Sequence, residues 1–243
     1  MVIQRALGAD IVMAFDECVA YPSPRAYVAA SLERTQRWLK RCLTVPLAAH
    51  QHLFGIVQGG VEEDLRRRAV EQVCVHDLPG YAIGGVSVGE GLDLLDRVVG
   101  WTAPLLPADR PRYLMGVGLP EDLLVSIGHG MDMFDCVIPT RYAREGTVFT
   151  WRGRMRLRDK RYRKDRYPID TACTCYACRR GFSRAYLRHL FFANEILGQT
   201  LATIHNLTFY QDLMAAARQA IVEDRFAAWA RTVRADMTAK ARS

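Results

Sequence analysis

Three closely spaced cysteines are the clearest sign of chemistry in this sequence. Cys173, Cys175 and Cys178 form a C-x-C-x₂-C motif in a polar, turn-rich stretch, where thiols can converge on one metal ion. Tetrahedral zinc needs a fourth ligand, and the candidates are His205, at the end of an apolar run, and His189, which is closer in sequence. His189 falls inside an expected helix and would point away from the loop unless that helix packs on it, so we favour His205. A closed Cys₃His shell leaves no open position and predicts one structural zinc ion per chain, the alternative being three free thiols or a stray disulfide.

A single carboxylate in an apolar segment is the second candidate. Asp135 lies within Met133–Val137, which we expect to be a short buried strand. Burying a charge in such a strand costs folding free energy unless the charge is paired with an opposite one or serves in binding or catalysis. The chain then enters an expected loop with a turn at Pro139, followed by Arg141 and Arg144. This pattern fits a nucleophilic carboxylate beside a phosphate-binding loop. These residues alone, however, favour the simpler interpretation that Asp135 caps the next turn or pairs with Arg141.

Further polar residues and glycines follow other apolar runs. Asp16 and Gln58 could together read the edge of a purine-like base, because a carboxylate accepts hydrogen bonds and an amide both donates and accepts them. Backbone amides at Gly84–Gly85 could bind a ring carbonyl, and Tyr113 and Met115 could pack against a flat ring. Each of these residues also has an ordinary structural explanation, as a cap, a turn or a core residue.

Short apolar runs alternate with helical patterns in the first half of the chain. The expected strands are Ile11–Phe15, Leu53–Val57, Gly80–Ile83, Arg112–Met115 and Met133–Val137, and the expected helices are Pro24–Arg41, Val61–Cys74, Leu92–Val99 and Pro120–Ile127. These strands are so apolar that they show no alternation of apolar and polar residues, which indicates parallel strands covered by helices. The candidate residues lie at or just past the strand ends, which share the active-site face of a (β/α)₈ barrel. A doubly wound α/β sheet also fits, but we find no G-x-G-x-x-G loop opening a helix, so we prefer the barrel.

The pattern changes after Thr140, where the chain becomes basic. We expect a hairpin around Arg152–Gly153, a solvated charge run, a sixth strand at Leu201–Ile204, and helices at Ser183–Leu197, Phe209–Ile221 and Glu223–Met237. We therefore assign residues 1–150 to the C-terminal portion of a (β/α)₈ barrel and residues 151–243 to a zinc-binding subdomain with terminal helices. Because such a barrel needs eight strands, the count predicts that its N-terminal part is absent.

The composition favours a polyanionic partner. The 243 residues are 50% hydrophobic and carry a formal net charge of +7. No run approaches the roughly 18 apolar residues of a membrane span, and the first residues do not resemble a secretory signal. Four scattered cysteines stand in apolar segments, as reduced core thiols do: Cys18, Cys42, Cys74 and Cys136. These features predict a cytoplasmic protein with no membrane association.

Several segments, taken in order, resemble one enzyme family. They are AFDEC (Ala14–Cys18), FGIVQGG (Phe54–Gly60), YAIGGVSVGE (Tyr81–Glu90), RYLMGVG (Arg112–Gly118), MFDCVIPTR (Met133–Arg141), CTCYAC (Cys173–Cys178), and YLRHLFFANEILG with TIHN (Tyr186–Asn206). In these motifs the chain resembles the queuine/archaeosine tRNA-ribosyltransferase family, and in particular its bacterial tRNA-guanine transglycosylases. No single motif is specific, whereas the ordered set is.

The resemblance implies an activity and a fold. The fold would be a (β/α)₈ barrel with a zinc subdomain, in a homodimer. The activity would be exchange of the wobble guanine of certain tRNAs for a 7-deazaguanine, in queuosine biosynthesis. Asp135 would be the nucleophile that attacks the ribose anomeric carbon and holds the RNA covalently, as carboxylates do in retaining glycosidases. Asp16, Gln58 and Gly85 would bind the base, with Met115 stacked on it.

The resemblance also assigns RNA contacts and metal ligands. The target base would leave its stack to enter the pocket. The residues along the anticodon loop would be Gly116, Val117, Gly118, Leu119, Pro120, Glu121 and Asp122, with Thr140, Arg141, Tyr142, Ala143 and Arg144. The zinc ligands would be Cys173, Cys175, Cys178 and His205.

The sequence departs from the family pattern in several places. Val88 keeps a branched side chain where queuine-using relatives tend to have Gly, which favours 7-aminomethyl-7-deazaguanine over bulky queuine. Val86 replaces a common Leu, Tyr142–Ala143 replaces the more usual Asn-Gly, and one extra residue separates Cys178 from His205.

The largest departure is the lack of an SDSGGFQ motif, whose Asp acts in the family as general acid/base. Roughly the first third of the family's length is then expected to be absent, in agreement with the strand count. The chain alone would be an inactive fragment, the product of a misassigned start, or one part of an enzyme completed by a partner. The competing interpretations are a non-catalytic zinc-containing RNA-binding module and, with less support, an unrelated zinc-bearing barrel hydrolase.

Overall fold

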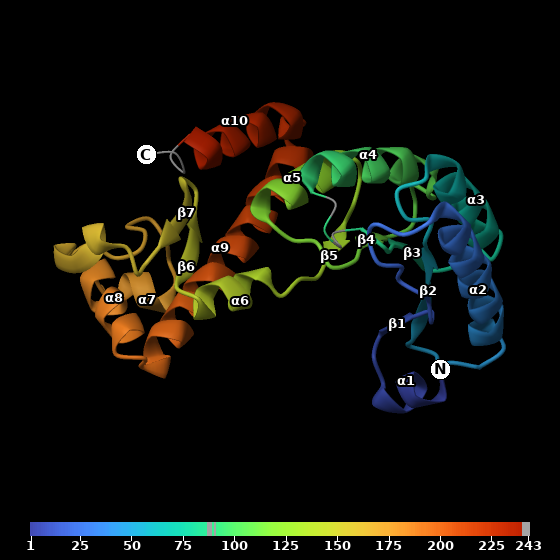
Figure 1. Ribbon diagram of the computed structural model, residues 1–243, viewed down its shortest axis with the longest axis horizontal. Coiled ribbons are helices and arrows are strands. Elements are labelled where there is room, and N and C mark those ends of the chain that lie inside the picture. The colour runs from blue at the N-terminus through green and yellow to red at the C-terminus, as the bar shows by residue number, and fades with distance from the viewer. Residues whose placement is uncertain (87–88, 90, 240–243) are drawn as a thin grey trace. The chain divides into compact units, whose positions relative to one another are not determined.

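The computed structural model describes residues 1–86, 89 and 91–239 (Figure 1). It divides into two compact units, Met1–Cys136 and Val137–Ser243, each with its own core. The domain boundary at residue 150 stays a prediction; residue 150 is the last residue of a strand within the second unit.

The first unit is built on a five-stranded parallel sheet with its strands in sequence order. The strands are β1 (Ile11–Met13), β2 (His52–Val57), β3 (Gly80–Ile83), β4 (Arg112–Leu114) and β5 (Met133–Phe134). Each strand pairs in parallel with the next, and Val12 lies opposite Leu53 in the first pair. The predicted alternation of parallel strands and helices is therefore confirmed for these elements.

Helices connect the strands and pack beside one another. They are α1 (Val2–Leu7), α2 (Arg25–Leu43), α3 (Glu63–Cys74), α4 (Leu92–Thr102), the 3₁₀ turn η1 (Ala103–Leu105) and α5 (Pro120–Gly128). Helix α2 packs on α3, α3 on α4, and α4 on α5, while α3 also packs against β2 (Figure 1). The core joins strand residues such as Ile56 and Ile83 to helix residues such as Leu32 and Val73, all almost fully buried.

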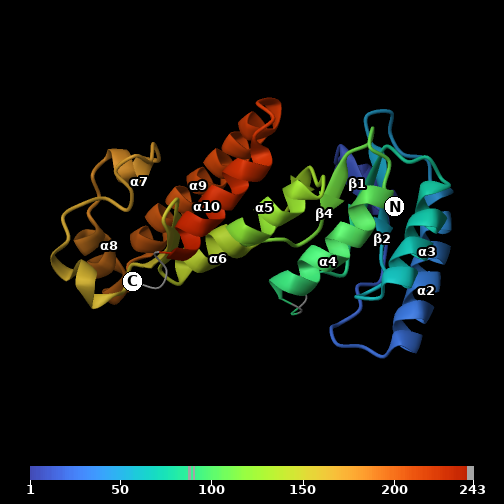
Figure 2. The ribbon, with the colours of Figure 1, turned by 90° about the horizontal axis from the view of Figure 1, so that it is seen from above.

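The second unit is mostly helical. Its elements are α6 (Ile138–Arg144), β6 (Thr147–Thr150), β7 (Gly153–Arg156), the 3₁₀ helix η2 (Lys160–Lys164), α7 (Tyr176–Arg179), α8 (Arg184–Phe192), α9 (Ile196–Val222) and α10 (Phe226–Ala239). The long helix α9 packs against α6, α7, α8, β6 and α10, and it lies beside α10 in Figure 2. Strands β6 and β7 form the predicted antiparallel hairpin, with Val148 opposite Met155.

Three expectations from the sequence are wrong. Leu201–Ile204 is not a strand but lies inside α9, because an apolar run of this length does not distinguish a strand from a buried helical segment. Pro139 does not lie in a loop: it occupies the first turn of α6, where its missing N–H costs nothing. The predicted helix Ser183–Leu197 is split, since α8 ends at Phe192 and α9 begins at Ile196.

Strand β5 is shorter than predicted, which changes the setting of Asp135. Pairing with β4 stops at Phe134, so Asp135 follows the strand and is exposed, and Val137 keeps 63% of its surface exposed. Within the described residues, β5 is the last strand of the sheet and pairs with β4 alone. The expected buried strand charge is therefore a charge at a strand end. None of the described helices combines the length and the apolar character needed to cross a membrane.

Candidate functional site

The candidate residues follow the carboxyl ends of the strands in the first unit. Gln58 directly follows β2, Met115 directly follows β4, and Asp135 directly follows β5. Gly85 lies two residues after β3, and Asp16 lies three residues after β1. Because all five strands are parallel, these residues share one edge of the sheet, where parallel α/β folds bind ligands.

Asp16 and Gln58 form a hydrogen-bonded pair at this edge. Gln58 Nε2 donates to Asp16 Oδ2 at 2.6 Å, and the Gln58 side chain is buried. Burial raises the pKa of the Asp16 carboxyl, although the hydrogen bond from Gln58 acts in the opposite direction. The structure thus brings together the two polar side chains that the sequence suggested for reading a base.

The two glycines after β3 let the Gln58 amide approach the backbone. A Cβ at Gly84 would lie 2.6 Å from Gln58 Nε2, and a Cβ at Gly85 would overlap Gln58 Oε1. Gly85 also has φ +66°, in the left-handed region that favours glycine. Both positions therefore need glycine so that the Gln58 amide can lie against this loop.

Arg66 is a residue of this site that the sequence analysis missed. Its side chain is fully buried in α3, and its guanidinium donates to four main-chain carbonyls. The acceptors and distances are Gly60 (2.8 Å), Val57 (3.1 Å), Gly84 (2.8 Å) and Gly85 (3.2 Å). One arginine therefore ties the turn after β2, which contains Gln58, to the turn after β3, which contains Gly85.

The helical phase of α3 is the signal that could have found Arg66. Arg66 stands one turn before Ala69 and Val70 and two turns before Val73, and all three are buried. Arg67 and Arg68, which complete the run of three arginines, are exposed.

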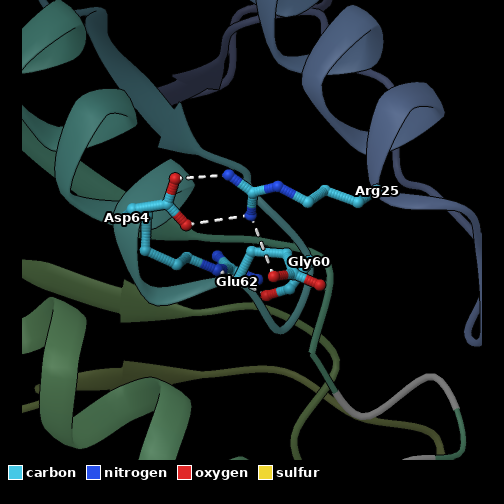
Figure 3. A network of polar contacts seen from close by, with 5 residues as sticks. Arg25, Gly60, Glu62 and Asp64 are labelled. Atoms are coloured by element: carbon cyan, nitrogen blue, oxygen red, sulfur yellow. Dashed lines mark hydrogen bonds and ion pairs between the residues drawn. The ribbon is translucent and has the colours of Figure 1, made fainter.

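A second ionic network lies at the outer end of this region. Arg25, at the start of α2, donates to Asp64 at 2.9 and 2.5 Å and to Glu62 at 2.9 Å (Figure 3). Asp64 belongs to the first turn of α3, and Figure 3 shows Gly60 beside Glu62. These two exposed ion pairs link the start of α2 to the start of α3, next to the turn whose carbonyls Arg66 binds.

Asp135 accepts two hydrogen bonds on one oxygen. The Tyr113 hydroxyl donates to Asp135 Oδ1 at 2.6 Å, and the Gly116 N–H donates to the same atom at 2.8 Å. Burial, and then the bond to this carboxylate, raises the pKa of Tyr113 above its usual range. Asp135 Oδ2 has no hydrogen bond within the described residues, so the carboxylate is oriented and still presents one oxygen.

The first predicted RNA segment, 116–122, runs from the strand end into α5. Gly116 is exposed with φ +74°, whereas Val117, Gly118, Pro120 and Asp122 are buried. Asp122 Oδ2 accepts from the Leu119 N–H at 3.2 Å and so caps α5. Within this segment, the exposed backbone at Gly116 is the part most accessible to an RNA ligand.

The second predicted RNA segment, 140–144, lies on α6 in the second unit. Arg141 and Arg144 are exposed, and Arg141 pairs with Glu145 at 3.8 Å. Tyr142 stacks on Phe149 with ring centroids 5.7 Å apart, and Ala143 is buried. Two cations are thus presented from one helix whose other face is packed.

Three cysteines and a histidine gather in the second unit. The ligand atoms of Cys173, Cys175, Cys178 and His205 all lie within 4.8 Å of one another. The His205 Nδ1 atom is 3.7 Å from Cys175 Sγ and 3.5 Å from Cys178 Sγ. A tetrahedral zinc ion with ordinary bond lengths would separate S and N ligands by about 3.6 Å, so the donor set fits zinc.

The second ring nitrogen of His205 supports the same conclusion. His205 Nε2 lies 2.8 Å from the main-chain carbonyl of Phe149, so Nε2 carries the proton and Nδ1 faces the thiols. His189, the rival candidate, is exposed on α8. Hydrogen bonds from Cys173 and then Cys178 lower the pKa of Cys175, whereas contacts with Cys173 and then Cys175 raise the pKa of Cys178.

The remaining cysteines and pocket-wall residues are placed as follows. None of the seven cysteines forms a disulfide within the described residues, and Cys42 is buried as expected whereas Cys18 is exposed. Val86 is buried after β3. Val88, on which the expectation about the base's substituent depends, lies outside the described residues.

Comparison with known proteins identifies the relatives of this chain. The family model described as queuine tRNA-ribosyltransferase matches residues 1–239. The chain belongs to the queuine tRNA-ribosyltransferase family. Proteins named queuine tRNA-ribosyltransferase from Desulforamulus reducens and Bacillus subtilis are 55% and 54% identical to it, in each case over 93% of the chain. A protein of the same name from Solidesulfovibrio magneticus is 54% identical over 98% of the chain.

The matches cover only part of each relative. The alignments span 60% of the Desulforamulus protein, 59% of the Bacillus protein and 63% of the Solidesulfovibrio protein. The chain therefore spans about three fifths of the length of these curated queuine tRNA-ribosyltransferases.

Proposed function

We propose that this chain carries the nucleophile and base-binding residues of a tRNA-guanine transglycosylase, a pentosyltransferase of queuosine biosynthesis. The enzyme would exchange the wobble guanine of tRNA for 7-aminomethyl-7-deazaguanine. The observation that carries the proposal is the Asp135 carboxylate, oriented by Tyr113 and Gly116 at the same sheet edge as the Asp16–Gln58 pair.

The chemistry at Asp135 follows from its geometry. Asp135 Oδ2 would attack the ribose anomeric carbon of the flipped nucleotide as the bond to guanine breaks, and that bond's electron pair would leave with the base. The incoming base then attacks the same carbon and displaces the carboxylate. The departing guanine takes up one proton and the incoming base loses one, so the exchange is balanced. The bonds from Tyr113 and Gly116 hold Oδ1 and so aim Oδ2.

The base would be recognised by residues of the neighbouring strand ends. Asp16 would accept hydrogen bonds from base N–H groups, and the Gln58 amide, held on Asp16, would add a second polar contact. Gly85, tied to Arg66 through its carbonyl, would offer its backbone, and the half-buried Met115 would pack on the ring. These contacts require the two turns to keep a fixed spacing, which Arg66 provides.

The metal site would have a structural role. Cys173, Cys175, Cys178 and His205 would hold one zinc ion, which would supply a cross-link between the cysteine-bearing loop and α9. The bond from His205 to Phe149 extends that link to β6. A closed shell of four protein ligands leaves this ion no direct part in base exchange.

The partners follow from the same proposal. RNA would contact segments 116–122 and 140–144, and the five-stranded sheet would form part of a (β/α)₈ barrel in a homodimeric enzyme. Reduced cysteines throughout the described residues fit a cytoplasmic setting.

The decisive experiment is exchange of labelled guanine into unmodified tRNA by the purified chain. Asp135→Asn should abolish exchange and the covalent RNA adduct seen on a denaturing gel. Asp109→Asn, which removes a carboxylate with 78% of its side chain exposed, should behave as wild type. Exchange that persists in Asp135→Asn would refute the assignment. If a zinc-loaded wild-type chain binds tRNA but gives no exchange and no adduct, the family's SDSGGFQ-bearing segment is supplied in trans. Exchange that then appears would identify an incomplete enzyme, and exchange that stays absent would favour the non-catalytic RNA-binding module.

A further inference from the structure

Arginines surround the β6–β7 hairpin in the second unit. Arg154 and Arg161 line two hollows, of about 420 and 490 Å³, which therefore adjoin one another. Arg152 lines only the first hollow and Arg156 only the second. These four residues are called here the hairpin arginine surface.

Most of the charge on this surface is unpaired. Arg152, Arg154 and Arg156 are exposed and make no ion pair with any described residue. Arg154 and Arg156 flank Met155, which packs against the core, so alternation along β7 directs both arginines to the opposite side. Arg161 pairs with Asp159 at 3.6 Å and lies over the Tyr162 ring. Unpaired like charges on one short strand indicate a surface that binds an anion.

The acidic residues of the two hollows do not neutralise these arginines. Glu145 and Asp159 line the second hollow, but Glu145 pairs with Arg141 and Asp159 with Arg161. Asp170 lines the first hollow and accepts a hydrogen bond from the Ala172 N–H at 2.9 Å. The net charge of the surface is positive.

Continuity with α6 identifies the kind of anion. Tyr142, within the segment proposed to contact RNA, lines the second hollow together with Arg154 and Arg156. Trp151 is half-buried in the first hollow, and an aromatic ring beside arginines suits the stacking of a base. Guanidinium groups bind phosphate through paired hydrogen bonds.

We propose that the hairpin arginine surface binds the phosphodiester backbone of the RNA substrate, and so extends the contact from α6 across β7 to η2. The proposal rests on the proposed function, since it takes RNA as the substrate. It adds a binding surface made by the zinc-bearing unit itself, formed by residues outside segments 116–122 and 140–144.

The test is the salt dependence of tRNA binding, measured by fluorescence anisotropy with the full chain. Arg154→Gln/Arg156→Gln should raise the Kd about tenfold and lower the slope of log K against log salt by about 1–2. The loss should be equal for tRNA with guanine or adenine at the wobble position, because phosphate contacts carry no sequence information. Arg154→Lys/Arg156→Lys, which keeps the charge, should restore most of the slope.

The matched control is Arg37→Gln/Arg218→Gln. It removes two exposed arginines, from α2 and α9, that line neither hollow and make no ion pair within the described residues. Circular dichroism and zinc content verify that each variant folds.

Each remaining outcome has a defined meaning. If wild type binds tRNA and the two Gln double variants share its Kd and slope, the surface proposal fails while the proposed function stands. A Lys variant as weak as the Gln variant would also overturn it, since charge would not be the cause. If the Gln variant loses affinity for polyglutamate but not for tRNA, the surface binds an acidic protein instead. A wild-type chain that binds no tRNA would refute the proposed function as well.

Discussion

The Tyr113 hydroxyl donates to Asp135 Oδ1 at 2.6 Å, so this bond couples β4 to the residue that follows β5. Tyr113→Phe removes this donor and leaves Asp135 Oδ1 held by the Gly116 N–H alone. We expect kcat for base exchange to fall about tenfold, the equivalent of one hydrogen bond, with little change in KM. A change confined to KM, measured in steady-state guanine exchange, would mean that Tyr113 binds substrate rather than orients Asp135.

Gly85 is expected to tolerate no side chain, for two separable reasons. Gly85→Ala places a Cβ at φ +66° and against Gln58 Oε1, and should displace the Gln58 amide and weaken base binding. Gly8→Ala is the matched control, because Gly8 has φ +74° but an added Cβ meets nothing within 4 Å. Both should lose about 1 kcal/mol in denaturant unfolding for the backbone conformation, and Gly85→Ala should lose more. Equal losses, with unchanged base affinity by calorimetry, would show that the contact with Gln58 is unimportant.

Arg66 should be the most sensitive arginine of the first unit. Arg66→Met removes the guanidinium donor from the carbonyls of Gly60, Gly84 and Gly85, and from that of Val57, which keeps its bond from the Gly84 N–H. The free energy of unfolding should fall by at least about 3 kcal/mol. Arg67→Met, its exposed neighbour paired with Glu63, should change little.

Arg66→Lys gives the functional readout for the same residue. A lysine keeps the charge but cannot reach all four carbonyls, so we expect a folded protein with weaker base binding and an increased KM for the base. A Lys variant with wild-type KM would show that Arg66 stabilises the unit without positioning the base-binding turns.

The raised pKa of Asp16 predicts a pH dependence of stability. Burial makes the Asp16 carboxyl of the folded protein bind its proton more tightly than the unfolded chain does. Protonation of Asp16 therefore adds to folding stability below the unfolded pKa, and this contribution is lost as pH rises through the higher folded pKa. Asp16→Asn keeps an acceptor for Gln58 Nε2 but no longer titrates. Its melting temperature relative to wild type should therefore rise between about pH 3 and pH 7. A difference in melting temperature that stays constant over that range would contradict the effect of burial.

Removal of the metal should destabilise the second unit and identify its histidine ligand. His205→Ala should lower zinc content and melting temperature, whereas His189→Ala should leave one zinc ion per chain, because His189 is exposed and outside the cluster. Atomic absorption and thermal melts with and without chelator measure both effects. Full zinc occupancy in His205→Ala would remove His205 from the ligand set.

The sequence by itself determined the βα alternation, the placement of Asp16, Gln58, Gly85, Met115 and Asp135 at strand ends, and the grouping of Cys173, Cys175, Cys178 and His205 as candidate metal ligands. Apolar runs, helical periodicity and ligand spacing are local properties, so they can be recognised without the fold.

Only the tertiary structure decided which of these residues touch. The Tyr113–Asp135 bond joins segments more than 20 residues apart, and the exposure of Asp135 depends on where β5 stops pairing with β4. Arg66 stands in a run of three arginines, and its packing against the turns after β2 and β3 makes it the buried one. Such contacts depend on how segments distant in the chain meet, and the local pattern of residue types does not contain that information.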